Sequence, residues 1–271
     1  MPPIRVTEYS VPLEGVKIHC REWGTEGPPV LFLHHTTGNS LHWSDVASQI
    51  ARDFRAIAID LRGHGGSSKP AAGYSWAEDY ARDVGQFLER QLHEPAVLGG
   101  LSLGAMVSVP VVVRMPERVR GVVLEDPPAF PSSNASPEIY AFFGERLSLR
   151  RMPLHDRIRC LVEQGQDREE AERSAHGMET WCEEVLAEYI SGGTTYSAEE
   201  WFPQVRCPAL VIVGNPERGS VVTLEERALL SQLVPGSRLV ACEASGHAPH
   251  EDEFERFLEA LSAFLKELYS G

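Results

Sequence analysis

The sequence lacks the features that mark membrane, secreted and nucleic-acid-binding proteins. It has no run of 18 apolar residues, so we expect no transmembrane helix. Its first residues do not follow the basic-then-apolar order of a secretory signal peptide. Positive charge is scarce, because 25 Lys and Arg residues face 39 Asp and Glu residues, for a formal net charge of −14. We therefore expect neither nucleic acid nor a membrane surface as a partner.

Cysteine is sparse too, and the five cysteines are scattered over the 271 residues. None of them has the spacing of a metal-ligand motif. Free thiols in a reducing, cytoplasmic compartment are the simplest interpretation, and we expect neither a metal nor a cofactor. The remaining composition, with 42% hydrophobic and 24% charged residues, is ordinary for a globular protein, here expected as a monomer or homodimer.

Short apolar segments alternate with helical patterns along much of the chain. The expected strands lie at residues 4–11, 16–22, 30–33, 55–59, 96–99, 121–125, 209–213 and 238–241. The first two alternate as an antiparallel pair does, whereas later ones are continuous apolar runs. Capping-box patterns that begin at Ser75, Thr180 and Thr223 predict helix starts. This order predicts an α/β fold with a mostly parallel sheet covered by helices on both faces.

The alternation stops in one stretch, from about residue 127 to 203, where no strand is evident and the composition is helical. It resumes afterwards, so the stretch interrupts one domain and does not separate two. We expect a core domain of residues 1–127 and 204–271 with a helical cap of residues 128–203.

Residues 100–104 read Gly-Leu-Ser-Leu-Gly and stand between an expected strand and an expected helix. A sharp strand-to-helix turn strains its central residue, so the residues two before and two after must be small. Ser102 would then be a nucleophile at the sheet edge, and the backbone N–H of Leu103 would bind an oxyanion. An ordinary glycine-rich loop explains the five residues alone, but it does not explain their place between strand and helix.

A serine hydroxyl needs a base, because it is a weak nucleophile at neutral pH. Among ten histidines, His247 lies in the loop after the last expected strand, which a parallel sheet brings to the same edge as Ser102. His250, at the start of the last helix, fits a surface role better. We therefore expect His247 to be the base.

The loop after the strand at residues 30–33 begins with two histidines, His34 and His35, followed by Thr36. The backbone N–H of Thr36 is our candidate for the second oxyanion donor. Adjacent histidines project to different sides and no pair of carboxylates stands near them, which argues against a metal site.

A second glycine-rich loop, residues 60–68, follows the next strand. It has neither of the glycine spacings that bind nucleotide phosphates. We interpret it as a structural turn in which Asp60 and Arg62 tie loops together.

These motifs together resemble the α/β-hydrolase superfamily, in its capped, esterase-like branch. The resemblance covers nearly the whole chain and rests on His34 with its loop, Asp-x-Arg-Gly-x-Gly-x-Ser at residues 60–67, the motif around Ser102, and Gly-His at 246–247. It implies an eight-stranded sheet with strand 2 antiparallel and a helical cap after strand 6. His35 departs from the family, which usually has glycine there, and would narrow the acyl side of the pocket or add a polar group to it.

The resemblance leaves the acid of the catalytic triad between two carboxylates. Members commonly carry it after strand 7, where residues 214–217 read Gly-Asn-Pro-Glu. Some branches, including lactone hydrolases similar to the zearalenone-cleaving enzymes, carry it after strand 6, where Asp126 stands here. We favour Asp126, because the two prolines that follow stiffen its loop, whereas Glu217 adjoins Arg218 in a polar loop.

The nucleophile decides among the chemistries of the family. Members that open epoxides or displace halide use an aspartate where Ser102 stands, so the resemblance implies hydrolysis of a carboxylic ester or lactone. The expected partner is a small to medium-sized, largely apolar substrate molecule. Carbon–carbon bond hydrolysis and a cofactor-free haloperoxidase-like activity are alternatives within the family, and a non-catalytic small-ligand receptor is the alternative outside it.

The cap is expected to select the substrate, with His35 and Trp181 as candidate binding residues. Some of its aromatic residues must pack in the core, and others line the pocket. These aromatic residues are Tyr140, Phe142, Phe143, Trp181, Tyr189, Tyr196, Trp201 and Phe202.

Overall fold

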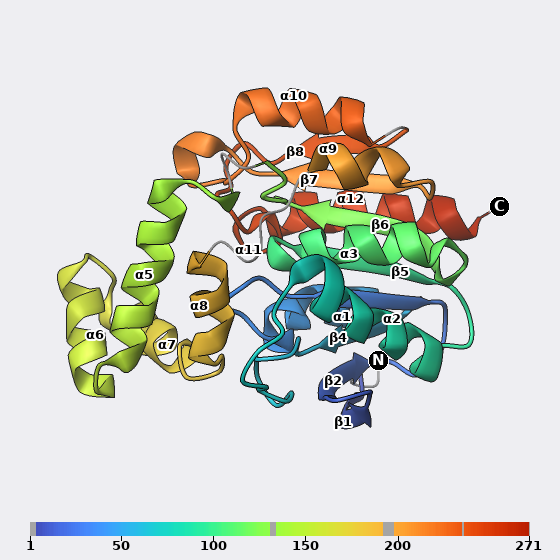
Figure 1. Cartoon of the computed structure of the whole chain (residues 1–271). Helices are drawn as coiled ribbons and strands as arrows, with labels where there is room; N and C mark the ends of the chain where they lie inside the picture. The colour runs from blue at the N-terminus through green and yellow to red at the C-terminus, as the bar shows by residue number, and fades with distance from the viewer. Residues whose placement is uncertain (1–3, 131–133, 192–197, 235, 271) are drawn as a thin grey trace.

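The structure is a computed structural model and describes residues 4–130, 134–191, 198–234 and 236–270. An eight-stranded sheet forms its centre (Figure 1). The strands are β1 (Val6–Pro12), β2 (Lys17–Trp23), β3 (Pro29–Leu33), β4 (Arg55–Ile59), β5 (Ala96–Leu101), β6 (Val119–Glu125), β7 (Ala209–Val213) and β8 (Arg238–Ala241). Their spatial order is β1-β2-β4-β3-β5-β6-β7-β8. β2 runs antiparallel to β1 and β4, and all other neighbours are parallel, which confirms the predicted sheet.

The parallel strands end nearly level with one another. Leu33 of β3 is in register with Gly100 of β5, and Leu101 of β5 is in register with Glu125 of β6. The segments that directly follow β3, β4, β5, β6 and β8, here called the strand-end loops, therefore leave the sheet at one edge.

Helices cover both faces of the sheet (Figure 1). α1 (Ser44–Ile50) and α12 (Phe254–Tyr269) share one apolar cluster with the sheet, whereas α2 (Ala81–Gln91), α3 (Leu103–Arg114) and α10 (Leu224–Leu233) belong to the cluster on the other face. A short helix, α11 (Pro249–Asp252), precedes α12. No helix within the described residues is both long enough and apolar enough to span a bilayer.

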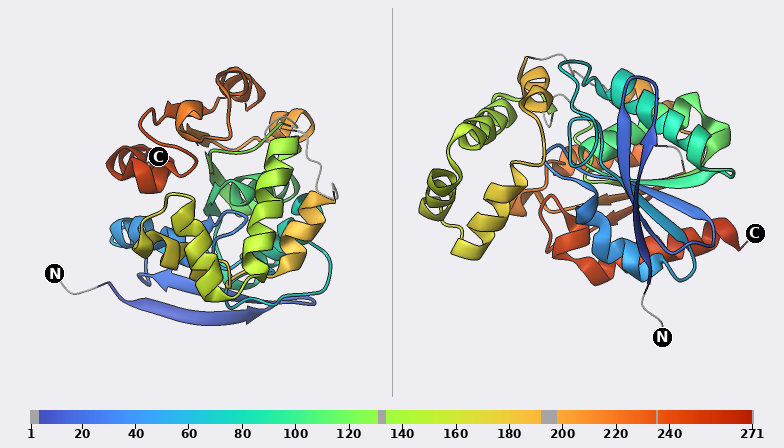
Figure 2. Two further views of the ribbon diagram at one scale, coloured as in Figure 1. Left: turned by 90° about the vertical axis from the view of Figure 1, so that its left-hand side faces the viewer. Right: turned by 90° about the horizontal axis from the view of Figure 1, so that it is seen from below.

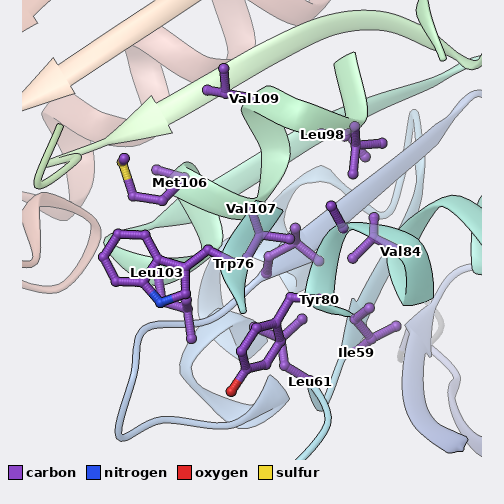
Figure 3. Close-up of a cluster of buried hydrophobic side chains, with 14 of the residues drawn as sticks. Ile59, Leu61, Trp76, Tyr80, Val84, Leu98, Leu103, Met106, Val107 and Val109 are labelled. Atoms are coloured by element: carbon purple, nitrogen blue, oxygen red, sulfur yellow. The ribbon is translucent and has the colours of Figure 1, made fainter. Parts of the chain in front are cut away.

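Helix α3 is the most deeply buried of these helices, because all its residues from Leu103 to Val112 are buried. Figure 3 shows the cluster around it, which joins side chains of β4, β5, α2 and α3 and of the segment between β4 and α2: Ile59, Leu61, Trp76, Tyr80, Val84, Leu98, Leu103, Met106, Val107 and Val109. A helix packed on all sides has a fixed position, so its first turn, directly after Ser102, is held rigidly.

Between β6 and β7 the described residues form helices and no strand. We call these helices the helical insertion: α5 (Pro137–Arg151), α6 (Leu154–Glu163), α7 (Arg168–Gly177), α8 (Glu183–Ile190) and α9 (Ala198–Trp201). Figures 1 and 2 show α5 to α8 standing to one side of the sheet and its covering helices. The predicted bounds of the cap, residues 128–203, stay a prediction.

Only one of the three predicted capping boxes is formed. Thr223 accepts from the N–H of Glu226, whose carboxylate reaches back to the N–H of Thr223. The helix start predicted at Ser75 is confirmed, because Ser75 is the N-cap residue, but its capping box is not formed. The helix opens with a π-helical turn, and Asp79 rather than Glu78 accepts the N–H of Ser75, at 3.1 Å. The prediction for Thr180 is wrong.

Thr180 instead closes the preceding turn. Its hydroxyl donates to the carbonyl of Gly177 at 2.7 Å, and α8 begins only at Glu183 without a side-chain cap. The four-residue pattern does not distinguish a helix start from a turn, because a threonine hydroxyl bonds to nearby backbone in both.

Candidate active site

Ser102 sits on a strained turn between β5 and α3. Its φ of 54° and ψ of −113° lie in a region that residues other than glycine rarely adopt. A Cβ at position 100 would collide with the backbone of Gly104, and one at position 104 would collide with the carbonyl of Leu33. The turn therefore needs both glycines, and it brings the serine hydroxyl to the edge where the strands end.

His247 and Asp126 meet at this edge. Nδ1 of His247 lies 2.7 Å from Oδ2 of Asp126, which is fully buried. An ionised carboxylate only accepts hydrogen bonds, so Nδ1 carries the proton and Nε2 is left as the basic nitrogen.

Three further donors hold the carboxylate of Asp126. Gly214 N–H and the Ser220 hydroxyl donate to Oδ1 at 3.1 and 2.6 Å, and Val221 N–H donates to Oδ2 at 3.0 Å. With the ring of His247, every oxygen of the carboxylate has two donors. Such a set fixes the orientation of the carboxylate.

Glu217, the alternative acid, lies elsewhere. It is exposed in the turn Pro216–Arg218, where its N–H donates to the side chain of Asn215. The structure brings Asp126, and not Glu217, to His247. Sequence reasoning did not identify Ser220 and Val221, which stand in the loop that it considered as a source of the acid.

A cavity of about 500 Å³ brings the predicted residues together. Ser102, His247, Thr36 and Leu103 all line it. Within the described part of the chain, the N–H groups of Thr36 and Leu103 have no hydrogen-bond acceptor. Both are thus free to donate to a ligand atom in the cavity.

The cavity walls are largely apolar and aromatic. Trp76 contributes from the segment before α2, Phe142 and Phe143 from α5, and Tyr189 from α8. Trp181, which we predicted to bind substrate, does not line this cavity. It is fully buried and borders a neighbouring cavity. Tyr196 lies outside the described residues.

The histidine pair divides into a structural and a cavity residue. His34 is buried, with Nδ1 donating to the carbonyl of His35 at 2.7 Å and Nε2 accepting from Leu61 N–H at 3.0 Å. Burial holds the pKa of His34 well below its ordinary value, so the ring is neutral. His35 lines the cavity, and desolvation followed by the nearby His42 ring holds its pKa low as well.

No metal site emerges from these side chains. Among the residues that the structure describes, no three His, Cys, Asp or Glu side chains are grouped so that they could hold an ion. Asp60 instead accepts from Ser40 N–H at 2.7 Å and Gly66 N–H at 2.8 Å, and Arg62 binds Asp83 through two bonds of 2.6 Å. These contacts confirm the interpretation of residues 60–68 as a structural turn.

The prediction of a surface role for His250 is wrong. Only 3% of it is exposed, and its Nδ1 lies 2.9 Å from the fully buried carboxylate of Glu125. The N–H of His250 donates to the same carboxylate at 2.7 Å. Glu125 is the last residue of β6, and a carboxylate buried there needs a partner, which His250 provides. The pair of His250 and Glu125 therefore links the segment that carries His247 to the end of β6.

Comparisons with known proteins agree with this fold. A model of the alpha/beta hydrolase family matches residues 30–260. The chain is 40% identical over 111 residues to 2-(acetamidomethylene)succinate hydrolase of Mesorhizobium japonicum, a match that covers 41% of this chain and 39% of that protein. It is 24% identical over 259 residues to N-formylmaleamate deformylase of Pseudomonas putida, covering 94% of this chain and 95% of that protein.

A solved structure extends the first of these likenesses over the whole chain. The crystal structure of E-2-(acetamidomethylene)succinate hydrolase superposes with a TM-score of 0.81 at 25% identity, and the match covers 97% of this chain and 100% of the other.

Proposed function

The chain belongs to the alpha/beta hydrolase family, and from that premise we propose that it is a serine hydrolase that acts through an acyl-enzyme on Ser102. Its proposed substrate is a carboxylic ester or lactone of small to medium size with a largely apolar body. The observation that carries the proposal is one cavity lined by Ser102, His247 and two unpaired N–H groups.

In the proposed reaction, Nε2 of His247 takes the proton of the Ser102 hydroxyl as the oxygen attacks the carbonyl carbon of the substrate. The carbonyl oxygen becomes negative and accepts from the N–H groups of Thr36 and Leu103. The C–O bond to the leaving alcohol then breaks, and His247 returns the proton to that oxygen. Water repeats the sequence on the acyl-enzyme, which releases the acid and restores Ser102.

Asp126 is the proposed acid of the triad. Its carboxylate keeps the proton of His247 on Nδ1 and stabilises the imidazolium that forms when Nε2 takes the proton of serine. The 2.7 Å contact and the three other donors to Asp126 support this role, because they leave the carboxylate one orientation.

The helical insertion is proposed to act as a cap over the nucleophile. Phe142, Phe143 and Tyr189 of the insertion line the same cavity as Ser102, so a substrate must fit between insertion and sheet. Such a cavity admits a small molecule and excludes a folded polymer. All five cysteines are free, which supports the proposed cytoplasmic location. We propose a monomer or homodimer that binds neither nucleic acid nor a membrane.

Covalent labelling tests the proposal. After treatment with a fluorophosphonate, mass spectrometry should find one adduct, on Ser102. Ser102→Ala should lose the adduct and at least about 10⁴-fold in kcat on p-nitrophenyl esters. Ser148→Ala, a change in an exposed serine of α5, should retain both. An unlabelled Ser102 in folded protein, or full activity in Ser102→Ala, would overturn the proposal.

A further inference from the structure

A second cavity, of about 660 Å³, lies beside the one that contains Ser102. The two cavities share three lining residues, His35, Thr37 and Phe142, so they meet at the loop after β3 and at α5. The second cavity is bordered by two arginines of the helical insertion, Arg146 and Arg173. It thus differs from the first cavity, whose described lining includes no arginine or lysine.

Arg146 is the residue that sets this cavity apart. It is half-buried on α5, and its guanidinium lies 5.0 Å from the centre of the Phe142 ring. Within the residues that the structure describes, it has no carboxylate within 4.0 Å and no hydrogen-bond acceptor. Burial lowers its pKa, and only the charge of Glu145 opposes that shift.

Every other arginine of the helical insertion has a partner. Arg151, Arg159, Arg168 and Arg173 each lie within 3.0 Å of a carboxylate oxygen, and Arg150 and Arg157 donate to backbone carbonyls. Arg173, the other arginine of the cavity, lies 2.8 Å from Glu169, and its side chain is 65% exposed. Arg146 is therefore singled out by its lack of a partner, and not only by its place.

A half-buried cation that has neither an ion pair nor a hydrogen bond to protein has lost part of its water and gained no such contact in exchange. A carboxylate of a ligand would compensate for the lost water, because its two oxygens can accept two parallel hydrogen bonds from the planar guanidinium. Phe142 stacks against Arg146 and borders both cavities, so it holds the guanidinium beside the path between them. Glu251 also borders the cavity, but its side chain is 51% exposed and lies 3.7 Å from His250.

We propose that Arg146 binds a carboxylate of the substrate, carried by the part of the molecule that extends from Ser102 into the second cavity. The inference rests on the proposed hydrolase function and narrows it to esters with one anionic end and an apolar middle. The first cavity cannot supply this contact, because its described lining has an acidic residue, Glu138, and no permanent cation.

Matched pairs of esters test the inference. The acyl-side pair is the mono-p-nitrophenyl ester of glutaric acid and its methyl ester, which removes the negative charge. The alcohol-side pair is 4-acetoxybenzoate and its methyl ester. We expect wild-type protein to prefer the charged member of at least one pair by about 10- to 100-fold in kcat/KM, as expected for a hydrogen-bonded ion pair.

Arg146→Gln should abolish that preference by raising KM for the charged ester, while kcat/KM for the neutral ester stays within about twofold. The neutral ester also reports that the variant is folded, and Arg146→Lys, with its single point charge, should keep part of the preference. Arg151→Gln is the control, because it removes an arginine from the same helix outside both cavities.

The outcomes separate the two proposals. If neither pair is hydrolysed and Ser102 takes no adduct, the hydrolase function fails. If neutral esters are hydrolysed but wild-type protein prefers no charged ester, or if Arg146→Gln keeps the preference, the hydrolase function stands and the role of Arg146 is wrong.

Discussion

The strand-end loops and the helical insertion hold their charged residues in opposite ways. In the loops the charges beside the candidate site are buried and hydrogen-bonded, as in Asp126 with its four donors and Arg62 with its two bonds to Asp83. In the insertion most charges are exposed, as in the pair of Arg168 and Glu172. The half-buried Arg146 has no partner among the described residues.

This difference fits the role that we propose for each region. Buried and bonded charges fix the positions of Asp126 and His247, as the proposed proton transfer requires. A cation left without a partner in the insertion is available to a ligand. We therefore expect changes in the loops to damage activity or stability strongly, and changes to exposed pairs of the insertion to do little.

The largest effect is expected for Asp126→Asn. It removes the carboxylate that holds the proton of His247 on Nδ1, and the loss in kcat should be about 10⁴-fold. Glu217→Gln, the matched change in the alternative acid, should cost less than about tenfold, because Glu217 is exposed in its turn. Steady-state kinetics with circular dichroism on both variants measures this. The reverse ranking would show that the carboxylate contact of His247 is not the functional one.

Next in size is the effect of Asp83→Asn on stability. Asp83 and Arg62 have side chains only 2% and 4% exposed, so the change removes the carboxylate that is hydrogen-bonded to a buried guanidinium. The carboxylate of Asp79, 3.6 Å away, is then the nearest negative charge that Arg62 keeps among the described residues. Breaking such a pair costs about 3–5 kcal/mol of unfolding free energy. Urea denaturation of wild type and variant gives the difference. A loss below about 1 kcal/mol would show that the loop does not depend on this pair.

The same comparison explains which parts the sequence could predict. The sheet and the place of Ser102 were predictable, because buried strands are continuous apolar runs and the turn at Ser102 admits only glycine at positions 100 and 104. The buried state of His250 was not, since it depends on Glu125, which is 125 residues away in sequence. Contacts over such distances leave no local pattern.

The insertion was predictable only as helical. The capping pattern that begins at Thr180 forms a turn and does not start a helix. Trp181 is a buried residue that borders the second cavity and does not line the first. The lack of a partner for Arg146 could not be read from the sequence, where Glu145 adjoins it, because neighbours on a helix point in different directions.

A smaller effect is expected from pH. Desolvation lowers the pKa of His250, but the charge and hydrogen bond of Glu125 raise it more, so the net pKa lies above the ordinary value. The pair therefore stabilises the fold fully below about pH 6.5, the usual histidine pKa, and this contribution is lost as pH rises through the raised pKa.

Thermal melts across that range check the sign. The melting temperature of wild type should fall as pH rises above about 6.5, and His250→Gln should melt lower and with a weaker dependence on pH. His155→Gln is the control, since the side chain of His155 is 78% exposed. An identical pH dependence in wild type and His250→Gln would show that the pair does not titrate.

The smallest effect is expected for Glu169→Gln, the counterpart in the insertion of Asp83→Asn. Glu169 and Arg173 form an i,i+4 pair on α7 at 2.8 Å, but their side chains are 85% and 65% exposed. Water and salt screen such a pair, so its loss should cost no more than about 0.5 kcal/mol of unfolding free energy, and 1 M salt should remove most of that.

The change Glu169→Gln also leaves Arg173, beside the second cavity, without its carboxylate partner. If Arg146 is the carboxylate ligand, Glu169→Gln should change the preference for charged esters by less than about threefold, since an exposed cation contributes little in water. A gain near tenfold would move the anion site from Arg146 to Arg173, towards the exposed side of the insertion.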